Sequence, residues 1–332
     1  MKTARCDLWA LGEYSYPAAF GFTPNITSYI HDEPEYEGRV LPCVVVVPGG
    51  AYRVVSPSED GIVAERFYHL GYNAFVVTYT TNLLELAPLK LQPLRDLSRA
   101  VRFVRRNAGE FNIDADKLVV CGFSAGGHLA GSLCVHCDDV VDQDPAYQAF
   151  SNRPDAALLC YPVITSGGEY AHKESFDVLL GVDATEEELT YMSLEKQVTP
   201  QTPPCFIWQT RTDEMVPVEN SILMANALRA AGVPVEHHVF SHGQHGLSLA
   251  DDVWASGDYG EPYTMEQMFG LVEAVKSGEV ELPPEKQETF AMFTSFGSED
   301  EGAAPMEFAP NEEVMVWPEL ADSWIRRTLC EE

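Results

Sequence analysis

The feature that most restricts the fold of this chain is a series of short apolar segments separated by longer amphipathic ones. Segments whose successive residues are nearly all apolar predict strands buried on both faces, as in a parallel sheet covered by helices. Such segments occur at residues 43–47, 73–79, 117–122, 155–162, 205–210 and 235–240. Apolar residues at helical spacing, with polar residues on another face, occur at 93–108, 219–232 and 317–329. This alternation predicts an α/β fold: a doubly wound, mostly parallel central sheet flanked by helices.

Charge and composition exclude several classes of partner. The chain has 332 residues and a formal net charge of −30 at pH 7. Because so acidic a surface repels phosphate backbones and anionic lipids, we expect neither nucleic acid nor membrane as a partner. The length suits a single domain over residues 1–332. The first 17 residues hold no continuous apolar stretch, which predicts a cytoplasmic protein without a signal peptide. Four cysteines in apolar runs are expected as buried free thiols: Cys43, Cys121, Cys160 and Cys205.

One serine stands where an apolar run ends and a helix-like stretch begins. In VVCGFSAGGHLAGS (119–132), Ser124 is flanked by Gly122 and Gly126. A plain turn could carry the same Gly-x-Ser-x-Gly pattern. The strand-to-helix context favours a nucleophile elbow, in which the serine takes unfavourable backbone angles and side chains at the glycine positions would block the bend. We therefore predict that Ser124 is a catalytic nucleophile.

A serine hydroxyl needs a base to remove its proton. His245 lies in the glycine-rich loop SHGQHGLSL directly after 235–240, so it should project from the carboxyl end of a strand. His242 is the nearest alternative, but it lies closer to the strand and lacks a following glycine. His245 is therefore the predicted base. Other histidines are interpreted as structural or too distant from the serine: His128, His136, His237 and His238.

The imidazole in turn needs a carboxylate that holds its tautomer. Asp213 follows the apolar segment 205–210 and precedes a Val-Pro pair that suits a helix start. Glu214 is adjacent, but only one of two successive side chains can face the serine. Asp213 is the predicted acid. The order Ser124, Asp213, His245 is that of α/β-hydrolases.

An oxyanion hole requires backbone amides near the nucleophile. The amide of Ala125 directly follows Ser124, and the loop PGGAY (48–52) follows an earlier strand. Its glycines allow a close approach of the backbone, so the amides of Gly50 and Ala51 are predicted as further donors. A plain Pro-Gly-Gly turn is the alternative interpretation of this loop.

Several motifs occur together in a fixed order. They are PGGAY (48–52), LQPLRDLSRAVRFVRRNAGEFNID (91–114), GFSAGGHLA (122–130), YPVIT (161–165), SLEKQVTPQTPPCFIW (193–208), TDEMVPVENS (212–221) and HGQHGLSLA (242–250). With these motifs the chain resembles the α/β-hydrolase esterases of the hormone-sensitive-lipase-like and acetyl-xylan-esterase-like branch. The Pro-Gly-Gly loop is most similar to the acetyl-xylan-esterase-like members. The resemblance implies hydrolysis of short acyl esters, of the acetyl type, on sugars or xylo-oligosaccharides, without a metal or an organic cofactor.

The chain departs from that pattern at two places. Ala51 stands where a third glycine is usual, which keeps the amide but adds a methyl group near the acyl pocket. A long acidic insertion, residues 258–313, separates His245 from the last predicted helix and carries 14 acidic residues against two lysines. A loop of this length in a compact domain is functional or disordered in most cases. It could be a surface extension, a lid over the active site or an arm that forms a homodimer.

Three other functions compete with an esterase. A zinc site is one, since His237, His238, His242 and His245 are close in sequence and Cys134 and Cys137 have a ligand-like spacing, but no second Cys pair accompanies them. A prolyl-oligopeptidase-like peptidase or amidase shares the order of the three catalytic residues, but the chain has no room for a propeller domain. The third is an inactive hydrolase-fold binding protein, which would have no use for a complete set of catalytic elements.

Overall fold

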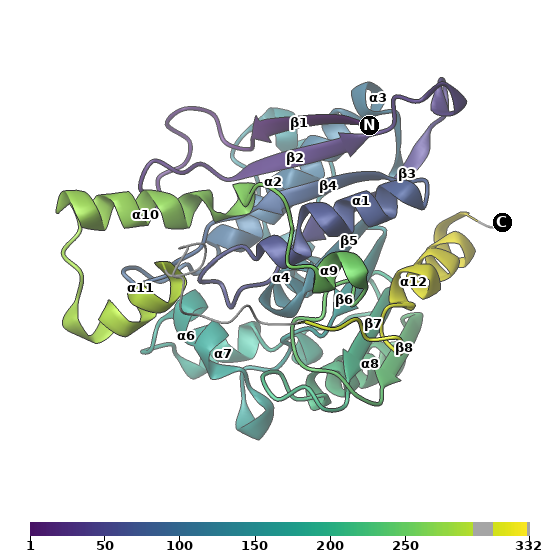
Figure 1. Cartoon of the computed structure of the whole chain (residues 1–332). Helices are drawn as coiled ribbons and strands as arrows, with labels where there is room; N and C mark the ends of the chain where they lie inside the picture. Colours follow the sequence, from purple (N-terminus) through teal and green to yellow (C-terminus); the bar gives the residue numbers. More distant parts are fainter. Residues whose placement is uncertain (295–307, 331–332) are drawn as a thin grey trace.

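A computed structural model describes residues 1–294 and 308–330 of the chain. Its centre is an eight-stranded sheet in the order β1-β2-β4-β3-β5-β6-β7-β8. The strands are β1 (Lys2–Asp7), β2 (Asn25–Ile30), β3 (Leu41–Val47), β4 (Asn73–Thr78), β5 (Ile113–Phe123), β6 (Ala156–Cys160), β7 (Cys205–Thr210) and β8 (Val235–Phe240). Strands β1, β2 and β4 pair antiparallel, and all other neighbours pair parallel (Figure 1). The predicted α/β fold is confirmed.

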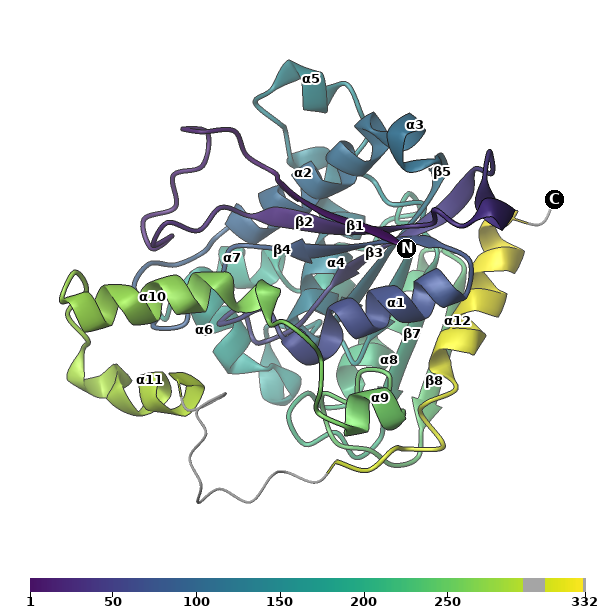
Figure 2. The ribbon, with the colours of Figure 1, turned by 45° about the horizontal axis from the view of Figure 1, so that its top comes forward.

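Helices cover both faces of the sheet. The longer ones are α1 (Gly61–His69), α2 (Gln92–Arg106), α4 (Ser124–His136), α8 (Glu219–Ala230), α10 (Glu266–Ser277) and α12 (Trp317–Ile325). The shorter ones are α3 (Ala108–Phe111), α5 (Pro145–Gln148), α6 (Lys173–Leu180), α7 (Glu186–Tyr191), α9 (Asp252–Ala255) and α11 (Gln287–Thr294). Figure 2 shows α12 beside β8 and α1 in front of the central strands. Within residues 1–294 and 308–330, no helix combines the length and apolarity needed to cross a bilayer.

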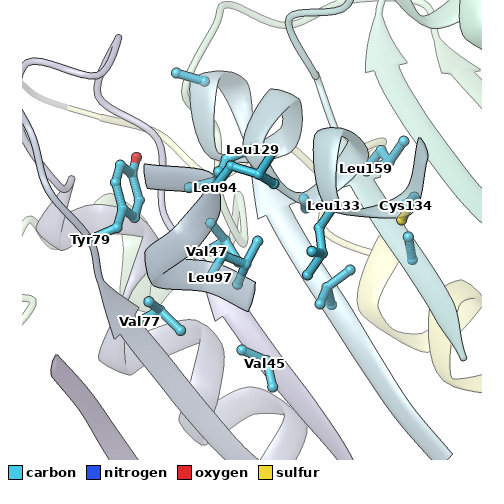
Figure 3. Close-up of a cluster of buried hydrophobic side chains, with 14 of the residues drawn as sticks. Val45, Val47, Val77, Tyr79, Leu94, Leu97, Leu129, Leu133, Cys134 and Leu159 are labelled. Atoms are coloured by element: carbon cyan, nitrogen blue, oxygen red, sulfur yellow. The ribbon is translucent and has the colours of Figure 1, made fainter. Parts of the chain in front are cut away.

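The alternation of side chains along β3 divides the core in two. Val45 and Val47 belong to the apolar cluster that includes residues of α2, α4 and α8, whereas Val44 and Val46 belong to the cluster that includes residues of α1 and α12. Figure 3 shows the first of these layers, with leucines of α2 and α4 over the valines of the sheet. Both faces of β3 are therefore dry, and this explains why its sequence is continuously apolar. Burial on both faces fixes the ends of the parallel strands, and with them the loops that carry the site.

Three of the five arginines of α2 are buried rather than exposed to solvent. Arg99, Arg102 and Arg105 are each at most 9% exposed. The guanidinium of Arg99 makes two bonds to Asp142, at 2.5 and 2.6 Å. The other two arginines donate mainly to carbonyl groups of residues 140–153. Together these three side chains attach the segment after α4 to the body of the molecule, so part of the polar face of α2 is buried against another part of the chain.

The two N-terminal strands were not predicted. β1 has the sequence KTARCD and every residue in it is exposed, so no apolar pattern marks it. β2 is buried, but its sequence NITSYI is half polar. Backbone pairing with both β1 and β4 makes this segment a strand, although its side chains show no strand pattern.

The described part of the acidic insertion packs against the body of the molecule. It contains α10 and α11, two helices that the sequence pattern did not predict, and residues 295–307 of the insertion lie outside the described residues. Gln267 is buried, donates to the carbonyls of Ala18 and Thr81, and accepts from the Thr81 amide at 2.7 Å. The insertion is thus joined to the loop that follows β4. In both views α10 and α11 lie at the same end of the molecule (Figures 1 and 2).

Candidate active site

The turn from β5 into α4 holds Ser124 in a left-handed conformation. Its φ is +52°, a region that costs free energy for any residue with a side chain. A Cβ on Gly122 would collide with the carbonyl of Gly126, and a Cβ on Gly126 would collide with the carbonyls of Val47 and Pro48. The two glycines therefore allow β5, β3 and α4 to approach closely enough to form the bend. Ser124 is 8% exposed at the start of the helix.

The structure brings His245 and Asp213 to this serine. The His245 Nε2 lies 2.8 Å from the Ser124 Oγ, and its Nδ1 lies 2.7 Å from Asp213 Oδ2. His245 comes from the loop after β8 and Asp213 from the loop after β7. All three side chains thus lie at the carboxyl edge of the parallel sheet, where sites in open α/β sheets are found.

The Asp213 carboxylate is fixed by more than the histidine. Its Oδ1 accepts from the amides of Met215 at 3.0 Å and Val216 at 2.9 Å, and the Gln209 side chain lies 3.4 Å from Oδ2. The side chain of Asp213 is 1% exposed. The neighbouring Glu214, the alternative acid, is exposed. Two backbone bonds orient the carboxylate so that one oxygen is left for the imidazole.

The other histidines lie elsewhere. The carbonyl of His242 accepts from Asn311, and the ring of His237 lies 3.0 Å from the Ser221 Oγ. The His238 ring lies 2.9 Å from Glu236. His128 and His136 are buried on the later turns of α4. Within the described ranges, no group of three or more His, Cys, Asp or Glu side chains is arranged to hold a metal ion.

The loop after β3 contains Gly50 and Ala51, whose amides are predicted as oxyanion donors. Gly50 has φ +119° and Ala51 has φ +54°, so the loop curls in a left-handed conformation beside Ser124. In the part of the chain that the structure describes, no carbonyl or side chain accepts a hydrogen bond from either amide. Ala125 lies in the first turn of α4, where amides have no partner within the helix. These amides are available to an oxygen atom bound near Ser124.

The loop after β3 is also attached to α4 and to Met192 through buried hydrogen bonds. Tyr52, at φ +60°, is fully buried and its hydroxyl lies 2.7 Å from the His128 Nδ1. The His128 Nε2 lies 2.9 Å from the Met192 carbonyl, which accepts its proton. The tautomer that this requires leaves Nδ1 as an acceptor for the tyrosine hydroxyl. The loop is therefore held by a buried chain of two hydrogen bonds.

A pocket of about 330 Å³ opens over these groups. Its lining residues include Gly50, Ala51, Ser124 and His245, together with Arg53, Glu59, His172 and Glu174. Thr289, Met292 and Phe293 of α11 form another part of the wall. The described part of the acidic insertion thus borders the same pocket as the nucleophile.

Several residues of the site carry no sequence signal. Arg53 lies 2.8 Å from Glu85, and Glu85 lies 2.9 Å from Lys286, the residue directly before α11. His172 has a pKa below its usual value, chiefly because of burial and then because of the nearby His245. Glu59 lies in a polar stretch that is typical of a solvated loop, yet it is 3% exposed. Only the fold brings these side chains to the pocket.

The sheet order and the strand-serine-helix turn define this protein as an α/β-hydrolase. Comparison with known proteins agrees with this. The profile of the BD-FAE family matches residues 30–228. The chain belongs to the BD-FAE family, and the predicted resemblance to α/β-hydrolase esterases of the acetyl-xylan-esterase-like branch is confirmed.

Curated relatives include proteins that act on xylan, according to their names. The chain is 51% identical over 267 residues to an endo-1,4-beta-xylanase B of Butyrivibrio fibrisolvens, covering 80% of this chain and 41% of the relative. It is 30% identical over 211 residues to an acetylxylan esterase of Xylanibacter ruminicola, covering 62% of this chain and 41% of the relative. The chain therefore spans about two fifths of the length of each.

Among solved structures, the acetyl ester-xyloside bifunctional hydrolase of Caldicellulosiruptor lactoaceticus superposes with a TM-score of 0.68. The two chains are 36% identical, and the match covers 84% of this chain and 97% of the other. The similar proteins are largely carboxylic ester hydrolases, which is the enzyme class that the sequence predicted.

Proposed function

We propose that this protein is a serine esterase that hydrolyses short acyl esters, above all acetyl esters on xylo-oligosaccharides or related sugars, through an acyl-enzyme. The observation that carries the proposal is the continuous chain of hydrogen bonds from Ser124 Oγ through His245 to Asp213, at 2.8 and 2.7 Å. It lies beside backbone amides that have no acceptor among the described residues. A serine, a base, an orienting acid and oxyanion donors are the components that acyl transfer requires.

In the proposed reaction, His245 Nε2 takes the Ser124 proton as Oγ attacks the ester carbonyl. The amides of Gly50, Ala51 and Ala125 donate to the oxyanion that forms, and Asp213 stabilises the imidazolium. The imidazolium then protonates the leaving alcohol, which departs and leaves an acyl group on Ser124. Water, activated by the same imidazole, hydrolyses that ester and restores the serine. No step needs a metal or an organic cofactor.

The pocket supports a small acyl group on a polar alcohol. The Ala51 methyl group reduces the space next to the predicted oxyanion donors. The lining also includes Arg53, His172 and Glu174, which can bond sugar hydroxyls, and apolar side chains of α11, which can pack against a sugar ring. Relatives named as an acetylxylan esterase and an acetyl ester-xyloside hydrolase support the same class of substrate.

We also propose that the acidic insertion serves as one wall of the substrate pocket. The ion pairs Lys286–Glu85 and Glu85–Arg53 link it to the loop after β3. Phe290 and Phe293 pack against the apolar cluster that includes Val54 and Leu83. These contacts hold α11 against the pocket that also contains Ser124 and His245.

The test is acetate release by the purified chain. We expect turnover of p-nitrophenyl acetate, lower kcat/KM for butyrate and octanoate esters, and acetate release from acetylated xylo-oligosaccharides. EDTA should leave the rate unchanged. Activity that EDTA abolishes and zinc restores, or activity on a prolyl peptide substrate but on no ester, would overturn the proposal.

A further inference from the structure

A buried carboxylate lies between the two loops of the site. Glu59, the last residue of the 3₁₀ turn Pro57–Glu59, is 3% exposed and lines the pocket with Ser124 and His245. A Cβ added to Gly49 would lie 2.9 Å from both Glu59 Oε2 and the Cβ of Ser124. The carboxylate is therefore within a few ångströms of the nucleophile, yet it is not part of the chain from Ser124 to Asp213.

One oxygen of Glu59 holds the loop after β3. Its Oε2 accepts a hydrogen bond from the amide of Gly49 at 2.7 Å. Gly49 directly precedes Gly50 and Ala51, whose amides are the proposed oxyanion donors. Fixing the Gly49 amide sets the plane of the peptide just before these donors, so it limits the directions in which they can point.

The other oxygen holds the loop after β8. Glu59 Oε1 accepts from the hydroxyl of Tyr161 at 2.5 Å, and that hydroxyl accepts from the amide of Ser248 at 3.0 Å. Ser248 lies three residues after His245. The ring of Tyr161 also packs edge-on against the imidazole, with ring centres 5.0 Å apart. Tyr161 therefore connects the Glu59 carboxylate to the loop after β8 and to the imidazole of His245.

In its ionised form, Glu59 also places a negative charge near the imidazole. Burial raises the pKa of its carboxyl above the usual value, because it outweighs the hydrogen bonds from Tyr161 and Gly49 and the charge of His245, which lower the pKa. A carboxylate stabilises a protonated histidine nearby, most strongly where water is excluded. The titratable groups that interact with Glu59 are Asp60, Tyr79, Cys160, Tyr161, His245 and Tyr259.

We propose that Glu59 is a positioning residue. Its two oxygens join the loop after β3 (48–52, the oxyanion loop) to the loop after β8, which carries His245, and its charge favours the imidazolium. The inference rests on the proposed esterase function. The charge acts when His245 holds the Ser124 proton, which is also when the oxyanion needs its donors in place. One side chain would thus stabilise the imidazolium and also hold the oxyanion donors in position.

The test compares Glu59→Gln with Tyr161→Phe. A glutamine has a single acceptor oxygen, so it cannot accept from both Gly49 and Tyr161, and it removes the charge. We expect kcat to fall about 10- to 100-fold with KM nearly unchanged, a loss smaller than that of an oxyanion donor itself. Inhibition by a boronic acid, which forms a tetrahedral adduct on the serine, should weaken in parallel. The acid limb of the kcat/KM profile should move to lower pH.

Tyr161→Phe keeps the charge and the Gly49 bond but breaks the connection to Ser248. We expect a smaller fall in kcat and an acid limb at its original pH. Glu65→Gln, on the exposed side of α1, is the matched control and should behave as the parent protein. Folding of each variant is checked by its melting temperature.

Two failures can be distinguished. Absence of Ser124-dependent turnover in the parent protein would overturn the proposed function. Full kcat and full boronic acid affinity in a folded Glu59→Gln variant, in a parent that is active, would overturn the role of Glu59 alone. If Glu59→Gln does not fold, unchanged kcat in Tyr161→Phe would do the same.

Discussion

The Ser124 Oγ and the His245 Nε2 lie 2.8 Å apart although 121 residues separate them in the sequence. Ser124 follows β5, whereas His245 follows β8, and β6 and β7 lie between these strands in the sheet. The loop after β8 must therefore reach back over the edges of two strands to meet the serine. Asp213 follows β7, the neighbour of β8, so the acid and the histidine come from the ends of adjacent strands.

Ser124→Ala is expected to abolish esterase activity, because no other hydroxyl would take the place of the nucleophile. The loss in kcat should be about 10⁵- to 10⁶-fold for a triad nucleophile, measured as release of p-nitrophenol. Ser132→Ala, on the same helix, is the matched control: the Ser132 Oγ is buried without a hydrogen-bond partner in the described structure. It should keep full activity. Turnover that survives in Ser124→Ala would refute the proposed nucleophile.

Asp213→Asn is expected to lower kcat by up to about 10⁴-fold, because an amide in place of the carboxylate favours the wrong imidazole tautomer. KM should change little, since the side chain is buried below the histidine. Glu214→Gln is the control, because Glu214 is exposed and adjacent. If the two variants showed equal rates in steady-state kinetics, another acid would have to orient His245.

The sequence predicted those parts of the molecule whose signal is local. All six apolar segments are strands. Five of them, β3 to β7, lie inside the sheet and have mostly buried, mostly apolar side chains, whereas β8 is an edge strand of sequence VEHHVF whose residues are mostly part-buried. The bend at Ser124 could be predicted because the Gly-x-Ser-x-Gly motif is itself local, although the close contacts that require Gly126 come from Val47 and Pro48 at the end of another strand. The positions of Asp213 and His245 could be predicted because each directly follows a strand.

Residues whose place depends on contacts far along the chain could not be predicted. From its sequence context Glu59 would be assigned to the surface. It is buried because the fold brings the hydroxyl of Tyr161, 102 residues away, to its oxygen. Gln267 on α10 bonds Thr81, 186 residues away. β1 has no buried side chain at all and is ordered by backbone pairing with β2. In each case the partner is supplied by tertiary structure.

Gly126→Ala is expected to prevent correct folding or abolish activity, since its methyl group would overlap the carbonyls of Val47 and Pro48. Relieving the overlap would push α4 away from β3 and move Ser124 from the imidazole. Gly109→Ala is the control, because a Cβ there meets nothing within 4 Å. Melting temperature and p-nitrophenyl acetate turnover are measured for both. A Gly126→Ala variant with normal stability and rate would contradict the packing of the elbow.

The stability of the folded protein should depend on pH through the buried His128. Burial lowers the pKa of His128 from 6.5 to about 4. Between these values the unfolded chain binds a proton that the folded chain does not, so the contribution of His128 to stability is complete above about pH 6.5 and is lost as the pH falls toward 4. The slope is at most about 1.4 kcal/mol per pH unit. Asp96 and Asp60 act in the opposite direction, because burial raises their pKa values to about 6 and about 7.

Because these groups act in opposite directions, the test compares the pH dependence of stability in two variants with that of the parent protein. His128→Gln can still bond the Tyr52 hydroxyl and the Met192 carbonyl but has no titration, so its free energy of unfolding should fall less steeply, or rise, from pH 7 to pH 5. His69→Gln, exposed at the end of α1, should follow the parent. Urea unfolding at pH 7, 6 and 5 gives the three curves. Parallel curves for His128→Gln and the parent would mean that His128 does not stay neutral in the folded protein, and that Tyr52 lacks the acceptor that holds the oxyanion loop.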